Sequence, residues 1–167
     1  MRCGIALGSN LGDRLAHLRA AVAALRLLHA GPEPPLVSPV YETEPVDCEP
    51  DSPAYLNAVM EIRCERGALG LLRALQQIEH REGRPAAHDF HAPRTLDLDL
   101  LYLGDTVLQS PALTLPHPRI ALRRFVLQPL ADIRPEFILP GHTQPVAELL
   151  AGLPASPGVR LFPQNVQ

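Results

Sequence analysis

Lysine is absent from this sequence, and all 15 basic side chains are arginine. A P-loop needs a lysine beside the nucleotide phosphates, and protein kinases place a strand lysine there. The sequence therefore excludes both classes of nucleotide site. Residues 8–13 (GSNLGD) also lack P-loop spacing, and we interpret them as a strand-to-helix turn with a helix cap. Any phosphate must be bound by arginine, by a metal ion or by backbone N–H groups.

Cysteine is scarce. The three cysteines, Cys3, Cys48 and Cys64, are odd in number, far apart and without CxxC spacing. This pattern indicates neither a disulfide framework nor a zinc site. We expect these side chains to be small apolar fillers of the core.

Long apolar runs and an excess of basic charge are also lacking. No stretch approaches the roughly 20 apolar residues of a membrane span, and none of signal-peptide length precedes Gly8. The net charge is −3 and the arginines are spread along the chain, which is unfavourable for binding a long nucleic acid. We expect a soluble, cytoplasmic protein with no nucleic-acid or membrane partner. Nothing indicates an obligate dimer, so we expect a monomer.

The hydrophobic pattern predicts one domain over residues 1–167 in which strands and helices alternate. The predicted elements are a strand at 3–7, a helix capped by Asn10 or Asp13 that ends near 31, strands at 36–43 and 55–64, a helix at 67–83 and a strand at 96–102. This order resembles the ferredoxin-like α+β plan, βαββαβ, in which an antiparallel sheet carries two helices on one face.

Two strands and a helix have further predicted properties. Pro39 lacks an N–H donor, so the strand at 36–43 should lie at a sheet edge. Apolar and other residues alternate along 55–64, which is typical of a half-buried strand. In the second helix the inward side chains are expected to be Leu69, Leu72, Leu75 and Ile78.

The last third of the chain is rich in proline. We predict that the strand at 96–102 turns at Gly104 and Asp105 into a hairpin with 106–108. Short helices are expected at 120–124 and 146–150, and we expect the tail from Pro154 to be loose.

Two aspartates carry the main chemical signal. Asp97 and Asp99 are two apart in a predicted strand, so they face the same side with α-carbons about 6.6 Å apart, and the intervening leucines face the core. Two carboxylates on one face repel each other unless a cation lies between them, and a pair of magnesium ions ~3.5–4 Å apart suits that span. A solvated strand face is the alternative.

Arginine and histidine side chains gather on both sides of this strand in the sequence. They are Arg84, His88, His91 and Arg94 before it, and His117, Arg119, Arg123 and Arg124 after it. Acidic metal ligands beside several arginines fit a polyphosphate bound through metal. Surface arginines with no shared target are the alternative.

Other polar residues could contact a ligand. Gln76 and Glu79 are one turn apart on the predicted helix, although an ordinary polar helix flank is the simpler interpretation. Thr43, Tyr55 and Asn57 lie on predicted strands, and Asn57 offers both a donor and an acceptor to a flat heterocycle. Taken alone, a tyrosine such as Tyr55 is more often a core or interface residue.

Seven segments together resemble the 6-hydroxymethyl-7,8-dihydropterin pyrophosphokinase family. They are residues 8–13 (GSNLGD), 38–43 (SPVYET), 55–58 (YLNA), 76–79 (QQIE), 83–84 (GR), 93–99 (PRTLDLD) and 116–119 (PHPR). The resemblance covers roughly residues 3–140, and the order of these segments is more specific than any one of them. The departures are Ala86, where many members have a further arginine, and His91, where some bacterial members have a loop tryptophan.

The resemblance implies an enzyme that transfers the terminal pyrophosphoryl group of ATP to the pterin hydroxymethyl group, releasing AMP, in folate biosynthesis. It implies two magnesium ions on Asp97 and Asp99, with catalysis by these aspartates, Arg84 and Arg94. The implied ATP contacts are Gln76, Glu79, Arg84, His91, Arg94, Leu100, His117 and Arg123. The implied pterin contacts are the rings of Tyr55 and Phe125, the side chains of Thr43 and Asn57, and the backbone at Glu44 and Val46.

Two other functions remain compatible with the residues alone. A metal-dependent phosphohydrolase would use Asp97 and Asp99 with water as the nucleophile, and would release phosphate or pyrophosphate without a pterin. A ferredoxin-like ligand-sensing domain would carry the same aspartates and arginines only on its surface. Tight binding of Mg-ATP would count against the second alternative.

Overall fold

The computed structural model describes residues 1–44, 53–83, 94–155 and 158–166. At its centre is an antiparallel sheet in the order β5-β1-β4-β3-β8, and β2 also pairs with β4. The strands are β1 (Arg2–Ser9), β2 (Leu36–Val37), β3 (Tyr41–Thr43), β4 (Tyr55–Arg63), β5 (Asp97–Leu103) and β8 (Val159–Leu161). The α+β fold class predicted from the sequence is confirmed.

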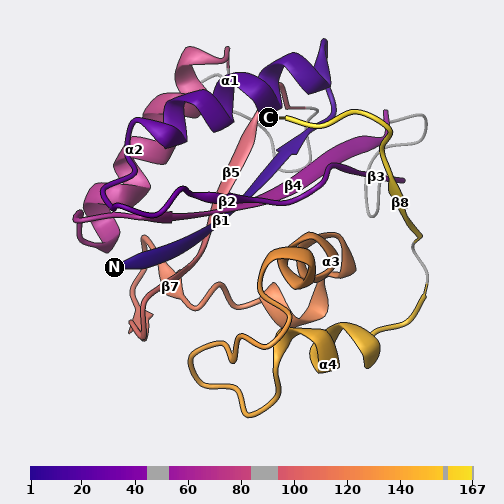
Figure 1. The fold of residues 1–167 in the computed structure, drawn as a ribbon. Coiled ribbons are helices and arrows are strands. Elements are labelled where there is room, and N and C mark those ends of the chain that lie inside the picture. Colours follow the sequence, from indigo (N-terminus) through magenta and orange to yellow (C-terminus); the bar gives the residue numbers. More distant parts are fainter. Residues whose placement is uncertain (45–52, 84–93, 156–157, 167) are drawn as a thin grey trace.

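Helices α1 (Arg14–Arg26) and α2 (Ala68–Arg81) lie together on one face of the sheet (Figure 1). Asp13 is the N-cap of α1, because its carboxylate accepts a hydrogen bond of 3.0 Å from the backbone N–H of Ala16. The larger hydrophobic cluster fills the space between these helices and the sheet. Both helices were therefore predicted correctly as elements, although α1 ends at Arg26 instead of near residue 31.

The buried stripe of α2 differs from the predicted one. Leu71, Ala74, Leu75 and Ile78 are buried, whereas Leu69 is 49% exposed and Leu72 is partly exposed. The helix faces the sheet with the positions three, four and seven residues after Leu71, and Leu69 falls outside that stripe. The predictions of Leu75 and Ile78 are confirmed, and that of Leu69 is wrong.

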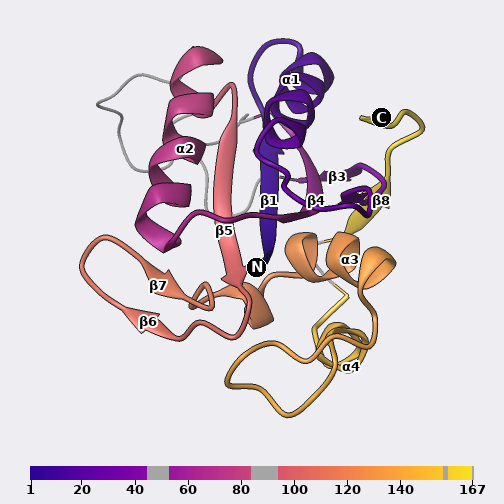
Figure 2. The ribbon, with the colours of Figure 1, turned by 60° about the vertical axis from the view of Figure 1, so that its left-hand side comes forward.

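A second helical layer covers the opposite face, where the sequence predicted none. Figure 2 shows α3 (Arg124–Ile133) and α4 (Val146–Ala151) on the side of the sheet away from α1 and α2. A separate cluster around Val59, Leu127 and Leu130 fills this layer. Strand β4 is consequently buried on both faces, so the expectation of a half-buried strand was wrong.

The missed helix α3 directly follows a short 3-10 helix at Ile120–Leu122, which matches the short helix expected at 120–124. Pro129 lies inside α3, and an internal proline normally argues against a helix because it removes one backbone donor. Here Val126, Leu127 and Leu130 are buried against the sheet, and this packing compensates for the lost bond. Helix α4 confirms the prediction at 146–150.

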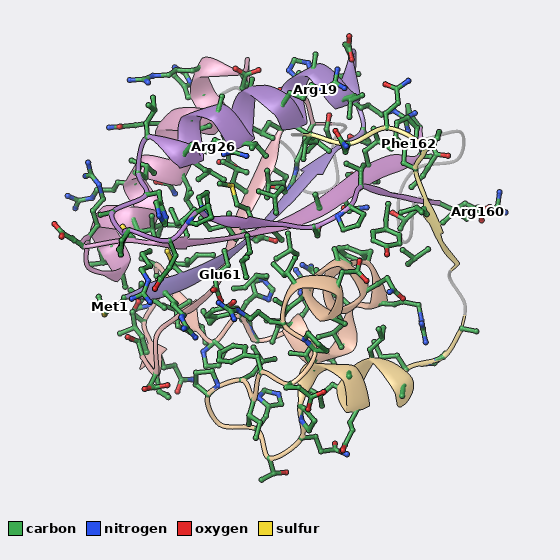
Figure 3. All side chains as sticks on the ribbon, in the orientation of Figure 1. Met1, Arg19, Arg26, Glu61, Arg160 and Phe162 are labelled. Atoms are coloured by element: carbon green, nitrogen blue, oxygen red, sulfur yellow. The ribbon has the colours of Figure 1, made fainter. Side chains whose placement is uncertain are left out.

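The C-terminal tail pairs with the sheet instead of being loose. Strand β8 lies beside β3, the N–H of Phe162 donates to the carbonyl of Val40 at 2.8 Å, and Val166 is buried. Phe162 also packs against the larger cluster, on the α1 side of the sheet in Figure 3. Strand β3 therefore lies between β4 and β8, so the edge-strand prediction holds only for β2.

The predicted hairpin forms further along the chain. Gly104 has a φ of 51°, and the N–H of Thr106 donates to the carbonyl of Leu103 at 3.0 Å, so the chain turns where expected. The next two residues leave the sheet without pairing with β5. The hairpin is instead formed by β6 (Leu108–Gln109) and β7 (Thr114–Leu115).

Candidate active site

Three neighbouring strands bring polar side chains together at one end of the sheet. Gly8 of β1 pairs with Asn57 of β4 on one side and with Asp97 of β5 on the other. A β-carbon built on Gly8 would lie 3.4 Å from the Asn57 Oδ1 and 3.9 Å from the Asp97 β-carbon. The absence of a side chain at Gly8 therefore keeps the space between an amide and a carboxylate open.

Asn57 and Thr43 form a buried polar pair beside Gly8. The Asn57 Nδ2 donates to the Thr43 Oγ1 at 2.8 Å, and this bond fixes the orientation of the amide. Tyr55 pairs with Thr43 in the ladder and lies two residues before Asn57, so it is on the same face of β4. The structure thus brings Thr43, Tyr55 and Asn57 together, while Glu44 follows Thr43 with an exposed side chain.

Asp97 and Asp99 project from β5 on the face covered by α3. The Arg94 Nη1 donates to the Asp97 Oδ1 at 2.9 Å. The Asp99 Oδ2 lies 3.5 Å from the Arg123 Nη1 and 4.0 Å from the His117 Nε2. Two carboxylates from one strand therefore meet cationic or polar groups from three different segments.

The electrostatics of this cluster reflect partial burial. The pKa of His117 is lowered, and burial is the largest cause. The negative charge of Asp99 opposes this shift, whereas the positive charges of Arg123 and Arg119 add to it. Burial also lowers the pKa of Arg123, helped by Arg119 and opposed by Asp99 and Asp97. The site is thus sufficiently desolvated to strengthen interactions with a charged ligand.

Helix α3 begins beside the aspartates. Arg123 is its N-cap residue, and the Arg123 guanidinium carbon lies 5.5 Å from the centre of the Phe125 ring. This cation–π contact holds an aromatic ring and a phosphate-binding type of side chain next to each other. Phe125 is only partly buried and packs at the border of the second cluster.

Glu79 contacts the outer edge of β5 at the residue between the two aspartates, and Gln76 lies one turn earlier on α2. The buried Glu79 Oε1 accepts from the backbone N–H of Leu98 at 2.8 Å, and Gln76 is exposed on the preceding turn of α2. The Leu100 side chain is buried in the larger cluster, on the opposite face of β5 from Asp99. Because the strand period is two, the backbone N–H of Leu100 faces the same edge as that of Leu98.

Sequence reasoning missed the contact that fixes Arg94. The Asn10 Oδ1 accepts from the backbone N–H of Arg94 at 2.7 Å, and the Asn10 N–H donates to the Arg94 carbonyl at 3.1 Å. The sequence presented Asn10 only as one of two candidate helix caps. A polar residue directly after a buried strand was the available signal, but its partner is far away in the sequence. Arg84, His91 and Val46 lie outside the described residues.

The donor set fits magnesium that is bound together with a polyphosphate. Among the described residues no three His, Cys, Asp or Glu side chains form a group that could hold a metal ion. Asp97 and Asp99 still offer carboxylate oxygens, and magnesium typically takes one or two carboxylates and completes its shell with water and phosphates. The buried Arg94 Nε has no acceptor within the described segments, which also fits an anionic ligand.

Known proteins match this chain over most of its length. The family model described as 7,8-dihydro-6-hydroxymethylpterin-pyrophosphokinase (HPPK) matches residues 4–135. A 2-amino-4-hydroxy-6-hydroxymethyldihydropteridine pyrophosphokinase from Pseudomonas aeruginosa is 42% identical over 156 residues, which are 92% of each chain. The folic acid synthesis protein fol1 of Schizosaccharomyces pombe is 39% identical over 158 residues, 95% of this chain.

Some of these proteins are much longer than this chain. It spans 21% of the fol1 protein. A crystal structure of Plasmodium falciparum HPPK-DHPS has the same fold, with a TM-score of 0.70 at 13% identity, covering 90% of this chain and 45% of that one. The length and identity of the bacterial and fungal matches decide the assignment. The chain belongs to the 7,8-dihydro-6-hydroxymethylpterin-pyrophosphokinase family.

Proposed function

We propose that this chain transfers the pyrophosphoryl group of ATP to the hydroxymethyl group of 6-hydroxymethyl-7,8-dihydropterin and releases AMP, a step of folate biosynthesis. Membership of the family supports this reaction. The structural observation that carries it is the pair Asp97 and Asp99, on one strand face, beside Arg94, Arg123 and His117. Carboxylates and cations converging in a half-buried site suit a metal-bound polyphosphate.

In this proposal Asp97 and Asp99 would hold magnesium ions bound together with the phosphates of ATP. Magnesium supplies neutralisation of phosphate charge and orientation of the phosphates. Arg94 and Arg123 donate to phosphate oxygens, since both guanidinium groups already lie at the aspartates. The pterin hydroxyl oxygen bonds to the β-phosphorus, the bond from that phosphorus to the α-phosphate oxygen breaks, and the hydroxyl proton is released. The side chains mainly position and stabilise charge.

The pterin would bind beside Gly8, where the sheet offers hydrogen-bonding groups and where the absence of a side chain leaves space. Asn57 and Thr43 supply these groups in a buried pair, as edge recognition of a flat heterocycle requires. Tyr55 and Phe125 are proposed to stack on its two faces, and the backbone at Glu44 and Val46 to complete the edge contacts. For ATP we propose further contacts from Gln76, Glu79, Leu100 and His117, and from Arg84 and His91 outside the described segments.

The decisive experiment follows nucleotide products by chromatography. Purified protein, Mg-ATP and hydroxymethyl-dihydropterin should yield AMP in step with pterin consumption, because attack falls on the β-phosphorus. Pterin-dependent ADP would contradict the proposal. Release of phosphate or pyrophosphate without pterin would instead support the phosphohydrolase.

The partners, the oligomeric state and the compartment of the protein are also proposed. None of the helices in the described segments is long and apolar enough to cross a bilayer. The chain has a net charge of −3, which supports small-molecule substrates over nucleic acid. We propose a monomer that acts in the cytoplasm without a membrane partner. Light scattering across a range of protein concentrations tests the oligomeric state.

A further inference from the structure

Asn10 connects the end of β1 to the residue that precedes the aspartate strand. It is 2% exposed, and its two hydrogen bonds with Arg94 run in opposite directions across 84 positions of sequence. One bond uses the Asn10 side chain and the other its backbone, so the side chain can be removed while the backbone bond remains possible. This geometry fixes the position and direction of the Arg94 main chain.

The two hydrogen bonds between Asn10 and the Arg94 main chain form a clamp. This clamp limits where the Arg94 guanidinium can lie. Arginine has a long side chain with many rotamers, and fixing its backbone reduces the positions that its end can reach. From this position the Nη1 reaches the Asp97 Oδ1 at 2.9 Å. The Nε is buried, and within the part of the chain that is described it has no acceptor.

Besides the Arg94 Nε, two buried hydroxyl groups on residues next to the clamp lack a hydrogen-bond partner among the described residues. They are the Oγ of Ser9, directly before Asn10, and the Oγ1 of Thr95, directly after Arg94. Buried polar atoms are nearly always hydrogen-bonded in folded proteins, so three unsatisfied atoms around one contact need an explanation. A polar ligand that binds next to Arg94 would provide an acceptor for the Arg94 Nε.

We propose that Asn10 is a positioning residue for the transfer reaction: by holding the Arg94 backbone, it directs the guanidinium toward both Asp97 and the nucleotide phosphates. This inference rests on the proposed function. Asn10 itself touches neither substrate in this account, and it acts only through Arg94. Misplacing a positioned group by about 1 Å can reduce turnover by about 10²-fold, so a lost clamp should be measurable in kcat.

The test compares Asn10→Ala, the conservative Asn10→Asp and a control, Ser38→Ala. Ser38 is equally buried and its Oγ also joins two segments, accepting from the Val59 N–H at 2.9 Å and donating to the Pro39 carbonyl at 2.7 Å. Asn10→Ala should lower kcat about 10- to 100-fold and change the dissociation constant for Mg-ATP less than about 3-fold. Asn10→Asp keeps the acceptor oxygen and should recover most of kcat. Ser38→Ala should lower the melting temperature similarly but leave kcat unchanged.

A double-mutant cycle separates positioning from general support. If Asn10 acts through Arg94, Asn10→Ala should have almost no further effect on kcat in an Arg94→Ala background. Independent losses that multiply would overturn the proposal, as would an unchanged kcat in Asn10→Ala alone. Wild-type protein that makes no AMP would refute the proposed function separately.

A spectroscopic readout tests the clamp without any turnover. In protein labelled with ¹⁵N-arginine, the Arg94 Nε–H signal can be assigned by its loss in Arg94→Ala. We expect this signal to be sharp in the wild type, to shift when a non-hydrolysable ATP analogue and magnesium are added, and to broaden in Asn10→Ala. An identical Arg94 signal in wild type and Asn10→Ala would overturn the proposal.

Discussion

Helix α3 has an arginine at each end, and each contacts a carboxylate on the same face of the sheet. Before the helix, Arg123 lies 3.5 Å from Asp99. After it, Arg134 donates to the Glu61 Oε1 at 2.6 and 3.1 Å, and the Tyr102 hydroxyl donates to the Glu61 Oε2 at 2.7 Å. Figure 3 shows Glu61 on the α3 side of the sheet.

The two contacts differ in how far the carboxylate is buried and hydrogen-bonded. Glu61 is 5% exposed and both of its carboxylate oxygens are bonded, as burial of a charge requires. The Asp99 side chain is 40% exposed, and its contact with Arg123 is longer. A long ion pair of 3.5 Å whose carboxylate is 40% exposed contributes little to stability, so Arg123 and Asp99 can exchange partners at low cost. The end of α3 at Arg134 and Glu61 is therefore the closed end, and the end at Arg123 and Asp99 is the open end. The closed end stabilises the fold, and the open end is suited to a ligand.

Removing either aspartate should have the largest effect on activity. Asp97→Ala and Asp99→Ala should each lower kcat by about 10³-fold or more, because each removes charge that the metal-bound phosphates need. Both side chains face away from the larger cluster, and loss of one of two like charges relieves repulsion. The free energy of unfolding, from urea titration, should change by less than about 1 kcal/mol. Near-normal turnover in either variant at ordinary magnesium would exclude the metal role.

The reverse result is expected at the closed end. Glu61→Ala should lower the free energy of unfolding by about 3 kcal/mol, because it leaves the buried Tyr102 hydroxyl and the Arg134 guanidinium without their acceptor. Below the melting temperature, kcat should stay within about 2-fold of the wild type. A variant of normal stability with strongly reduced kcat would show that the two ends are not separable in this way.

This contrast also explains which parts of the fold could be predicted from the sequence. The period-two spacing of Asp97 and Asp99 sufficed to place both on one face of a strand, because spacing is a local property. On β4 the alternation was correct, but Asn57 and Glu61 made one face look solvated. Their partners, Thr43 at 14 positions and Arg134 at 73 positions, satisfy them in the interior. Local pattern cannot reveal such distant partners.

The same limit applies to the second layer and to the site. Helix α3 contains Pro129, so its sequence favours a break, and only the packing of Leu127 and Leu130 against the sheet makes it a helix. Asn10 looked like a helix cap until Arg94 was placed beside it. Elements whose stability depends on long-range contacts were therefore the ones that sequence reasoning missed.

The two arginines of α3 provide a matched pair of variants with a smaller effect. Arg123→Ala should lower kcat about 10- to 100-fold, the range of one charge-assisted hydrogen bond of ~1.5–3 kcal/mol, with little change in stability. Arg134→Ala should destabilise the protein and leave kcat near the wild-type value. Steady-state kinetics and thermal melts on both variants check this. Equal loss of kcat in the two would contradict the distinction between the open and closed ends.

The smallest effect is expected from the Tyr102 hydroxyl. Burial, and then the charge and hydrogen bond of Glu61, raise the pKa of Tyr102 above its ordinary value of 10.0. The unfolded chain therefore loses this proton near pH 10 while the folded chain keeps it, so stability is fully present below about pH 10 and falls above it.

Tyr102→Phe should cost about 1 kcal/mol at neutral pH, because it removes one hydrogen bond, and should flatten the alkaline decline. Burial, and then the hydrogen bond and charge of Asp132, raise the pKa of Tyr41 to about 12, so Tyr41→Phe should flatten the decline below that pH to a similar extent. Urea titrations between about pH 7 and 11 measure both slopes, and an unchanged slope in Tyr102→Phe would mean that the Glu61 end is not closed to proton exchange.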